Sequence, residues 1–489
     1  MAALRPVSEE LIIKRIRLEN PWWDTGKIPK PYDSLRRRLY FDQLYQQITL
    51  LSVRRATVLM GPRRVGKTVM LYQVIGRLIA DGVPPRNICY LSIDAPIYNN
   101  ISLEELLALC KRAVNDQNSA QMYVIFDEIQ YLKNWEVHLK SMVDFYQEVR
   151  FVVSGSAAAA LKLKSNESGA GRFTEFMLPP LTFQEYLHLR DLTYLMRMES
   201  YRWFDIGFSF DVTDDWDTLN EHFISYINFG GYPEVIFNEA IQQDPGRFIR
   251  SDIIDKVLLR DLPSLYGIRD VQELNSLFNV IAYNSGNEFN LESLSQESGV
   301  DKLTIRKYLE YLEAAFLIKI LYPVGINTRR FQRDSRFKIY LTNPSMRCAL
   351  FAPIAPTDDH FGHMVETAIV AQWLHRGNVP LHFAAWPGGE VDLVMVTPTQ
   401  TPQFIVEVKW SNQFVKNPGK LKSLIKYANE NKKTLVWVTS IDKVTYQGYN
   451  NIRFLFLPAA SYCYSIGKNS LPQKVDPNSN NILSQPPEF

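Results

Sequence analysis

The chain has 489 residues, of which 46% are hydrophobic and 22% are charged, a composition that fits two or three globular domains and excludes a disordered or fibrous protein. Its 54 lysines and arginines nearly balance 52 acidic residues, so the net charge of +2 leaves room for a nucleic-acid surface only as a local patch. No apolar run reaches about 18 residues, so no membrane span is predicted. The four cysteines are far apart and lack C-x-x-C spacing, which argues against disulfides or structural zinc and favours a cytoplasmic location.

Residues 1–34 form a predicted N-terminal extension. Leu11, Ile12, Ile13, Ile16 and Leu18 indicate a short amphipathic helix, and Asn20-Pro21-Trp22-Trp23 follows it. Two adjacent tryptophans outside a regular helix are expected to anchor this segment against a core. The alternative is an exposed patch that binds a partner.

A phosphate-binding loop follows the apolar run Ala56-Thr57-Val58-Leu59-Met60, which is typical of a buried strand. Residues 61–68 fit the pattern G-x-x-x-x-G-K-[ST], in which glycines let backbone N–H groups point at phosphate oxygens and the next helix adds its positive end. Lys67 is expected to reach the β- and γ-phosphates, and Thr68 to bind Mg²⁺. The predicted nucleotide-binding residues are Gly61, Pro62, Arg63, Arg64, Val65, Gly66, Lys67, Thr68 and Val69.

A second apolar run, residues 121–126, ends in Asp127 and Glu128. Downstream of a phosphate loop, Asp127 fits the carboxylate that holds Mg²⁺ through its water shell, and Glu128 fits the base that orients the attacking water. Such an acidic pair can also simply begin a helix.

Two further residues are candidates for contact with the γ-phosphate. Ser154 follows the apolar strand Val149 to Val153, and ligands of α/β sheets lie at the carboxyl ends of strands. Arg172 lies in a glycine-bearing loop after Gly169 and could act as an arginine finger on a neighbouring subunit's nucleotide. A plain turn at Ser154 and a solvated Arg172 are the structural alternatives.

Alternating helices and strands over residues 35–185 predict a parallel sheet covered on both faces. Residues 186–255 are expected to be a helical connector, broken by a turn or hinge at Gly230-Gly231-Tyr232-Pro233. Residues 467–489 are rich in Asn, Ser, Pro and Gln and are expected to form a loose tail.

Residues 256–345 show a helix-turn-helix outline followed by two strands, which predicts a winged helix. Its second helix carries Lys302, Arg306 and Lys307, which could contact DNA phosphates. The intervening loop adds arginines of the predicted wing: Arg329, Arg330, Arg333 and Arg336. The alternative is a structural module whose basic side chains are merely solvated.

Residues 346–466 carry a second possible chemistry. Two predicted strands, 390–396 and 404–410, should pair as a hairpin and bring Asp392 beside Glu407 and Lys409. Two carboxylates and a lysine on one face can bind a metal ion and help water attack a phosphodiester, with Glu366 completing the metal shell. A nuclease-shaped but inactive scaffold and an ordinary salt-bridged surface remain the alternatives.

In the order of these motifs the chain resembles a group of prokaryotic AAA+ ATPases whose C-terminal half, of unknown function, combines a winged helix with a PD-(D/E)XK nuclease-like fold. The matching strings are Gly61 to Thr68, Phe126-Asp127-Glu128, Ser154-Gly155-Ser156, Gly171-Arg172, Gly230 to Glu234, Glu390-Val391-Asp392 and Glu407-Val408-Lys409. Asn343 is a departure, because an aspartate is expected there.

The resemblance implies an α/β fold, with a P-loop AAA+ parallel-sheet domain followed by the winged helix and the nuclease-like α/β domain. It also implies binding and hydrolysis of ATP with Mg²⁺. Three hypotheses follow: an ATP-driven switch, an ATP-regulated DNA nuclease, and a nucleotide-gated DNA- or protein-binding module that does not cut. The expected partners are ATP, DNA and either further copies of the chain or another protein, without a membrane.

Overall fold

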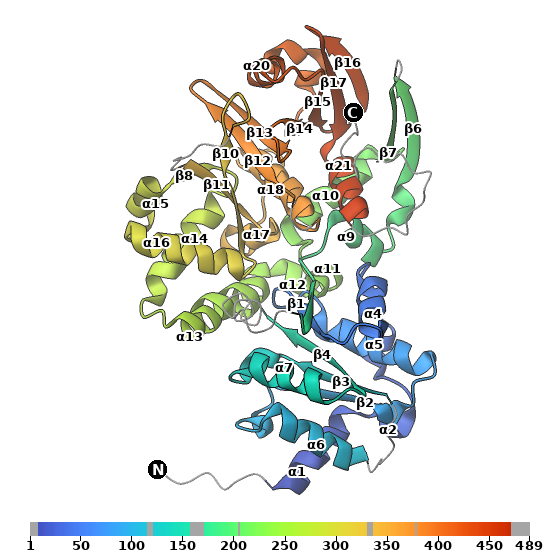
Figure 1. Cartoon of the computed structure of the whole chain (residues 1–489). Helices are drawn as coiled ribbons and strands as arrows, with labels where there is room; N and C mark the ends of the chain where they lie inside the picture. Colours follow the sequence, from blue (N-terminus) through green and yellow to red (C-terminus); the bar gives the residue numbers. More distant parts are fainter. Residues whose placement is uncertain are drawn as a thin grey trace. The chain divides into compact units, whose positions relative to one another are not determined.

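The computed structural model describes residues 8–114, 121–156, 171–203, 206–329, 336–376 and 379–470 (Figure 1). The chain forms two compact units, Met1–Pro179 and Pro180–Phe489. Several predicted positions lie outside the described residues: Gly169, Arg330, Arg333 and residues 471–489 of the expected tail.

The first unit is built on a five-stranded parallel sheet with strand order β2-β3-β4-β1-β5. Every residue of β1, β3 and β4 is buried, as expected for strands covered on both faces. The predicted α/β fold with a parallel sheet is thus confirmed. The strands are β1 (Ala56–Met60), β2 (Ile88–Ser92), β3 (Met122–Asp127), β4 (Val149–Gly155) and β5 (Phe173–Met177).

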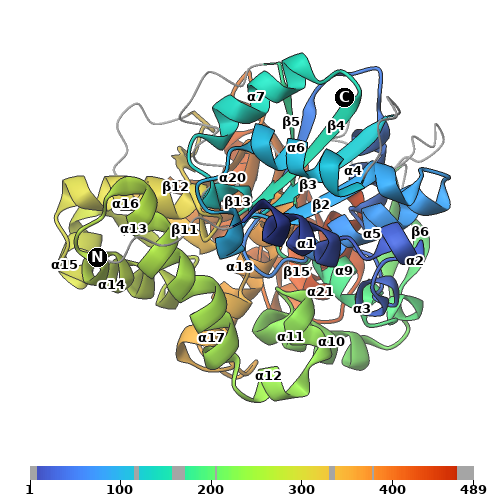
Figure 2. The same cartoon turned by 90° about the horizontal axis from the view of Figure 1, so that it is seen from below.

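The N-terminal segment packs onto this unit. The indole N–H groups of Trp22 and Trp23 both donate to the carbonyl of Ile88, at 3.0 and 2.8 Å, so the two tryptophans anchor the segment as predicted. Helices α1 and α6 contact each other and can be followed in Figure 2. The helices are α1 (Glu9–Glu19), α2 (Trp22–Thr25), α3 (Lys30–Asp33), α4 (Phe41–Thr49), α5 (Lys67–Ala80), α6 (Leu103–Val114) and α7 (Trp135–Phe145), with short 3₁₀ turns η1 (Pro85–Asn87), η2 (Pro96–Tyr98) and η3 (Ile129–Tyr131).

The second unit opens with helices and a β-hairpin, so the segment 186–255 that was predicted to be a helical connector also contains two strands. Antiparallel strands β6 (Arg197–Trp203) and β7 (Ile206–Val212) interrupt it, and Phe208 and Phe210 of β7 join the main core. The helical elements are α9 (Phe183–Leu189), η5 (Thr193–Leu195), α10 (Trp216–Phe229), α11 (Pro233–Phe237), α12 (Glu239–Gln243), the π-helical η6 (Gly246–Asp255) and η7 (Val257–Asp261), and α13 (Leu262–Tyr266).

The double glycine after α10 is a closely packed turn. A Cβ on Gly230 would overlap Tyr226, and a Cβ on Gly231 would overlap the side chains of Asn343 and Ser345. Asn343, where the resemblance led us to expect an aspartate, is buried and accepts a hydrogen bond from the Ser345 N–H at 2.9 Å. The Gly230-Gly231 turn and the segment at Asn343 to Ser345, about 110 residues apart, therefore pack directly on each other.

Three helices and a three-stranded antiparallel sheet, in the order β8-β11-β9, come next. Gly299, in the left-handed region at φ 77°, ends α15 and turns the chain into α16. The elements are α14 (Val271–Tyr283), β8 (Glu288–Asn290), α15 (Leu291–Ser298), α16 (Lys302–Ala314), β9 (Ile318–Leu321) and β11 (Arg336–Leu341).

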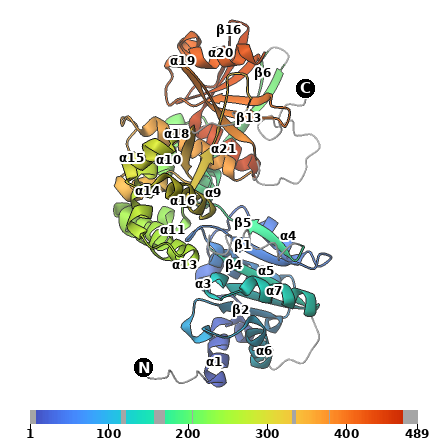
Figure 3. The same cartoon turned by 60° about the vertical axis from the view of Figure 1, so that its left-hand side comes forward.

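A seven-stranded mixed sheet, in the order β10-β12-β13-β14-β15-β17-β16, completes the second unit. Helices α18 and α21 belong to one hydrophobic core of this sheet, and α20 belongs to another, which can be followed in Figure 3. Its elements are β10 (Pro323–Val324), α17 (Ser345–Phe351), α18 (Phe361–Leu374), β12 (Leu381–Trp386), β13 (Gly389–Val396), β14 (Pro402–Glu407), α19 (Gln413–Lys416), η8 (Pro418–Lys420), α20 (Lys422–Glu430), β15 (Leu435–Ser440), β16 (Thr445–Tyr449), β17 (Ile452–Pro458) and α21 (Ala459–Ser470). The last helix extends four residues past the point at which the loose tail was predicted to begin.

Candidate functional site

The loop between β1 and α5 has the curled backbone that phosphate binding requires. Gly66 is left-handed at φ 97° and directly precedes Lys67, the first residue of the 14-residue helix α5. A Cβ on Gly61 would overlap the Leu178 carbonyl oxygen, so this position accepts only glycine. Backbone N–H groups at the start of a helix bind anions because they have no partner within the helix.

Lys67 is held within this loop. The residue is 5% exposed. Its ammonium group donates hydrogen bonds to the carbonyl of Gly61 at 3.0 Å and to that of Pro62 at 2.8 Å. These bonds hold the lysine side chain against the loop that is predicted to bind the phosphates.

Arg38 supports the loop from outside and was not singled out in the sequence. This buried guanidinium donates to the carbonyl of Val65 at 2.7 Å and to that of Pro179 at 3.0 Å. The signal that could have pointed to it is its place in a basic run, Arg36-Arg37-Arg38, although such runs are usually solvated.

Asp127 accepts hydrogen bonds from hydroxyl groups on three different elements. Thr68 Oγ1 on α5 donates to Oδ2 at 2.7 Å, Tyr90 Oη on β2 donates to the same oxygen at 2.8 Å, and Ser154 Oγ on β4 donates to Oδ1. The carboxylate is 1% exposed. Thr68, Asp127 and Ser154, which lie far apart in the sequence, are thereby brought together, with Tyr90 as an additional member.

Tyr90 was missed because a tyrosine inside an apolar strand is read as core. Burial, the nearby Asp127 charge and Tyr72 raise the pKa of its hydroxyl, so it stays a donor at physiological pH.

Glu128 adopts the left-handed conformation, with φ 56° and ψ 45°, which is uncommon for a residue with a side chain. Its N–H donates to Asp127 Oδ1 at 3.1 Å and lies 3.3 Å from Ser154 Oγ. The Gln130 amide donates to the Glu128 carboxylate and accepts from the Ser156 N–H at 3.2 Å. Gln130, also missed in the sequence, therefore orients the predicted base.

Arg172 lies away from this cluster. Its carbonyl accepts from Ala56 N at 2.9 Å, and the neighbouring Phe173 pairs with Ala56 at the first position of β1. The phosphate loop follows the last residue of that five-residue strand, about 17 Å along the sheet. The Arg172 guanidinium pairs instead with Asp144 at 3.1 Å, and both side chains are nearly half exposed.

The second cluster lies in the large sheet, where the predicted hairpin of β13 and β14 forms. Leu393 pairs with Val406, and this register brings Asp392 next to Glu407. Lys409 Nζ lies 3.3 Å from Asp392 Oδ2 and 2.9 Å from Glu407 Oε1. The hairpin thus brings together the three residues that the sequence predicted.

Glu366 of α18 belongs to a neighbouring ion pair. Lys338 Nζ, only 4% exposed at its side chain, lies 3.2 Å from Glu366 Oε1 and 2.5 Å from Glu390 Oε1. Tyr340 Oη donates to the same Glu366 oxygen at 2.6 Å. Lys338 was not predicted, although a lysine within the apolar strand Phe337-Lys338-Ile339-Tyr340 is itself a signal of a buried charge pair.

The predicted three-carboxylate metal shell is not assembled. Within the described ranges, no three His, Cys, Asp or Glu side chains are placed as a metal site would require. The physical reason is that Lys338 and Tyr340 already bind Glu366. Asp392 and Glu407 remain a pair of adjacent oxygen donors, and Mg²⁺ is commonly held by one or two carboxylates with water and substrate phosphates.

Burial and mutual repulsion separate the pKa values of these carboxyls. Burial, with the neighbouring Asp392 charge, raises the pKa of Glu407 to about 8, and one of its oxygens, Oε2, is buried without a hydrogen-bond partner. Burial raises the pKa of Glu366 to about 7 against the opposing effect of Lys338. Burial would also raise the pKa of Asp392, but Lys409, Lys338 and the Val408 N–H outweigh it and hold that pKa below its usual value.

Two protein-family models match parts of the chain. Residues 53–187 match a family model described as an AAA domain, and residues 220–357 match one described as Domain of unknown function (DUF8612). Over residues 53–187 the chain is thus similar to AAA domains, and the parallel sheet and phosphate loop of the first unit lie within this match.

The curated relatives are uncharacterized proteins. One, MJ1544 of Methanocaldococcus jannaschii, is 24% identical over 395 residues, which is 79% of this chain and 80% of the relative. Another, from Haemophilus influenzae, is 24% identical over 326 residues, which is 65% of this chain and 74% of the relative.

Solved structures with partial similarity include two nucleotide- or DNA-bound proteins. The Aeropyrum pernix ORC1 protein in complex with DNA has a TM-score of 0.32 at 11% identity, covering 64% of this chain and 91% of that one. The Saccharomyces cerevisiae Hsp104–ADP complex has a TM-score of 0.30 at 12% identity, covering 57% and 39%. In the parts of the chain that the structure describes, no helix has both the length and the apolar character to cross a bilayer.

Proposed function

We propose that the protein binds and hydrolyses ATP with Mg²⁺, with the nucleotide held between residues 61–69 and the acidic end of β3. The observation that carries this proposal is the 2.7 Å hydrogen bond from Thr68 Oγ1 to Asp127 Oδ2, which unites two motifs separated by 59 residues. The hydroxyl and carboxylate are oxygen donors of the type that Mg²⁺ prefers.

In this proposal Lys67 would bind the β- and γ-phosphates, and Thr68 and Asp127 would hold Mg²⁺. Bound Mg²⁺ would neutralise charge that develops on the phosphates. Glu128, oriented by Gln130, takes the proton of the attacking water, and Ser154 positions the Asp127 carboxylate.

The test measures ATP hydrolysis and ATP binding separately. Lys67→Ala is expected to abolish detectable ATP binding by calorimetry, whereas Glu128→Gln is expected to bind ATP and hydrolyse it at least 100-fold more slowly. Lys133→Ala, at an exposed lysine of the same unit, is the control and should match the wild type. Wild-type hydrolysis no faster than that of the two site variants would overturn the proposal.

We further propose that ATP binding changes the conformation of the second unit, and that the backbone turn at Gly230-Gly231 is the hinge for this change. Its support is the dense packing of this turn on Tyr226 and Asn343, which couples α10 to the segment after β11. Hydrogen exchange of the Glu128→Gln variant with and without ATP should show altered protection in residues 226–233. Identical exchange there would remove this part.

We propose that the segment from α14 to β11 is a winged helix that binds DNA, and its support is three helices together with the antiparallel sheet β8-β11-β9. Arg306 and Lys307 of α16 are exposed, which supports phosphate contact. Two other basic residues are partly neutralised, since Lys302 pairs with Glu292 and Arg336 pairs with Glu288 at 3.6 Å.

A second candidate function is metal-dependent DNA cleavage in a PD-(D/E)XK nuclease-like domain around β12 to β15. Its support is the position of Lys409, whose Nζ lies 3.3 Å from a carboxylate oxygen of Asp392 and 2.9 Å from one of Glu407. A plasmid cleavage assay with Mg²⁺ or Mn²⁺ tests it. Activity is expected to be lost in Asp392→Asn and kept in Asp442→Asn, and cutting that persists in Asp392→Asn would exclude this site.

We also propose a reducing cytoplasmic location and assembly with further copies or a partner protein. All four cysteines are free and buried, which supports the reducing compartment. The position of Arg172, away from its own phosphate loop, supports assembly, because its predicted role requires a neighbouring subunit.

A further inference from the structure

The segment from β14 to β17 carries a concentration of positive charge on a nearly neutral chain. Between residues 411 and 453 there are eight lysines and arginines and two acidic residues, a net +6, against +2 for the whole chain. One of the two acids, Asp442, pairs with Lys443 at 3.2 Å. The basic residues are Lys416, Lys420, Lys422, Lys426, Lys432, Lys433, Lys443 and Arg453.

Four of these lysines lie on α19, η8 and α20 with exposed side chains: Lys416, Lys420, Lys422 and Lys426. Among the described residues none of the four is in an ion pair, whereas Lys302 and Arg336 of the winged-helix segment are paired with glutamates. Lys426 additionally lies 6.0 Å from the centre of the Trp386 ring. Unneutralised ammonium groups retain their full attraction for a polyanion.

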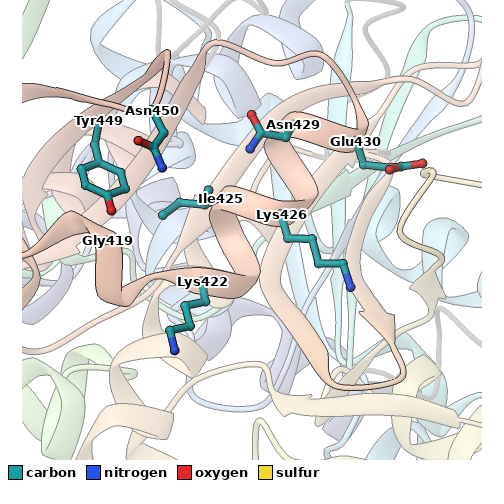
Figure 4. A pocket seen from close by; sticks show the side chains of 8 residues that line it. All are labelled: Gly419, Lys422, Ile425, Lys426, Asn429, Glu430, Tyr449 and Asn450. Atoms are coloured by element: carbon teal, nitrogen blue, oxygen red, sulfur yellow. The ribbon is translucent and has the colours of Figure 1, made fainter.

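Two of the lysines line a cavity of about 560 Å³ on this surface. Lys422 and Lys426 are one helical turn apart on α20, and Tyr449 and Asn450 lie across from Ile425 at the β16–β17 turn (Figure 4). The remaining lining residues are Gly419, Asn429 and Glu430. Glu430 is eight residues from Lys422, about 12 Å along the helix, and one helical turn from Lys426, and among the described residues it forms an ion pair with neither lysine.

The far wall of the cavity is rigidly built. Asn450 and Asn451 are left-handed at φ 50° and 61° and form the tight turn between Tyr449 and Ile452. Gln447 Nε2 donates to the Val415 carbonyl at 2.7 Å, and a Cβ on Gly419 would lie 2.7 Å from Tyr449 Oη. The strand β16 is therefore fixed against the lysine-bearing segment.

We infer that this α19–α20 surface, defined by Lys416, Lys420, Lys422 and Lys426 and the adjoining cavity, binds the phosphodiester backbone of nucleic acid. Protein-binding surfaces are depleted in lysine and enriched in aromatic and apolar anchors, whereas Ile425 is the lone aliphatic lining residue here. Lysine, asparagine and tyrosine are donors used on phosphate and sugar oxygens. Among the described residues no arginine lines the cavity, so bidentate reading of guanine is not expected and binding should be independent of sequence.

The test is binding of full-length protein to a fluorescent 24-base-pair DNA duplex, followed by anisotropy over a range of salt concentrations. The assay contains no nucleotide, so its result does not depend on the proposed ATPase. The variant Lys420→Gln/Lys422→Gln/Lys426→Gln is expected to bind at least tenfold more weakly, with a salt slope reduced by about 2 to 3, because each phosphate contact releases about one counterion.

The matched control removes the same charge from three exposed lysines of the first unit, as Lys14→Gln/Lys27→Gln/Lys133→Gln, and is expected to keep the wild-type affinity within twofold. The inference is overturned if the α20 triple variant keeps wild-type affinity within twofold and the wild-type salt slope. It is also overturned if a polyglutamate peptide binds the wild type and the duplex does not, because the partner would then be an acidic protein. Equal affinity for two duplexes of unrelated sequence is the further expected result.

Discussion

Thr68 Oγ1 lies 2.7 Å from Asp127 Oδ2, and this hydrogen bond joins the first turn of α5 to the end of β3. The two residues are separated by a helix, a strand and another helix in the chain, yet the parallel sheet directs both to its carboxyl edge. Tyr90 and Ser154 complete the set of hydroxyl donors around Asp127.

Loss of the Thr68 hydroxyl should impair hydrolysis more than folding. Thr68→Val keeps the shape of the side chain but removes a donor from Asp127 and an oxygen from the proposed Mg²⁺ site. We expect ATPase activity to fall at least 100-fold, about 2.7 kcal/mol of transition-state stabilisation. Thr68→Ser keeps the hydroxyl and should retain activity within a few-fold, and equal loss in both variants would contradict the assigned role.

Gly61→Ala should disable the phosphate loop by a steric route. The new methyl group would overlap the Leu178 carbonyl oxygen, so the loop must move away from its present path. We expect calorimetry to show ATP binding weakened at least tenfold. Gly207→Ala is the control because a Cβ there meets nothing within 4 Å, and similar ATP binding in both variants would show that this path is not required.

Arg172 is expected to act on the nucleotide of a neighbouring copy of the chain. Arg172→Ala and Glu128→Gln are each expected to be inactive, but an equimolar mixture should recover activity, because some interfaces then combine an intact arginine with an intact glutamate. ATPase rates at fixed total protein concentration provide the measurement. A mixture no more active than its components would remove Arg172 from this role.

Lys338→Met should destabilise the second unit strongly. Removing the ammonium leaves Glu366 and Glu390 without their shared cation, and breaking a buried pair from one side costs about 3–5 kcal/mol in the free energy of unfolding. Urea unfolding followed by tryptophan fluorescence tests this expectation.

Two comparisons make the Lys338 measurement specific. The double variant Lys338→Met/Glu366→Gln should recover part of the loss, since it also removes the buried carboxylate charge. Lys443→Met breaks an exposed pair with Asp442 and should cost less than about 1 kcal/mol. If Lys338→Met costs no more than Lys443→Met, the buried pair does not stabilise the fold.

Stability of the second unit should fall as pH rises from about 5 to about 8. Burial raises the pKa of Glu407 to about 8, above the ordinary glutamate value of 4.5, so in this interval the folded state holds a proton that the unfolded state has lost. The contribution is complete below the unfolded pKa and disappears as pH passes the folded one. Glu366, with a pKa raised to about 7, acts in the same direction.

The thermal midpoint measured across this pH range gives the test. Glu407→Gln does not titrate and should flatten the decline, whereas Glu297→Gln, at an exposed position on α15, should leave it unchanged. An unaltered decline in Glu407→Gln would show that this carboxyl titrates normally.

The local sequence was sufficient to predict those strands and loops whose conformation depends on their own residues. The apolar runs at 56–60 and 149–153 predicted buried parallel strands because such strands need no alternation. The glycine and lysine spacing of residues 61–68 likewise predicted the curled loop, since it depends on backbone freedom at Gly66 and on the space beside Gly61. The β6–β7 hairpin was missed because its aromatic residues fit a helical core equally well.

By itself the sequence determined the phosphate loop, the acidic strand end and the Asp392–Glu407–Lys409 hairpin, because each depends on residues at short or regular spacing. Tertiary structure alone decided that Arg172 lies at the amino end of the parallel strands, whereas the phosphate loop lies at their carboxyl end. It also decided that Glu366 pairs with Lys338 and so is not part of the predicted metal shell. The support that Arg38, Tyr90 and Gln130 give to the first site likewise depends on the tertiary structure. The physical reason is that a side chain's partners across a sheet depend on strand order and register, which spacing along the chain does not encode.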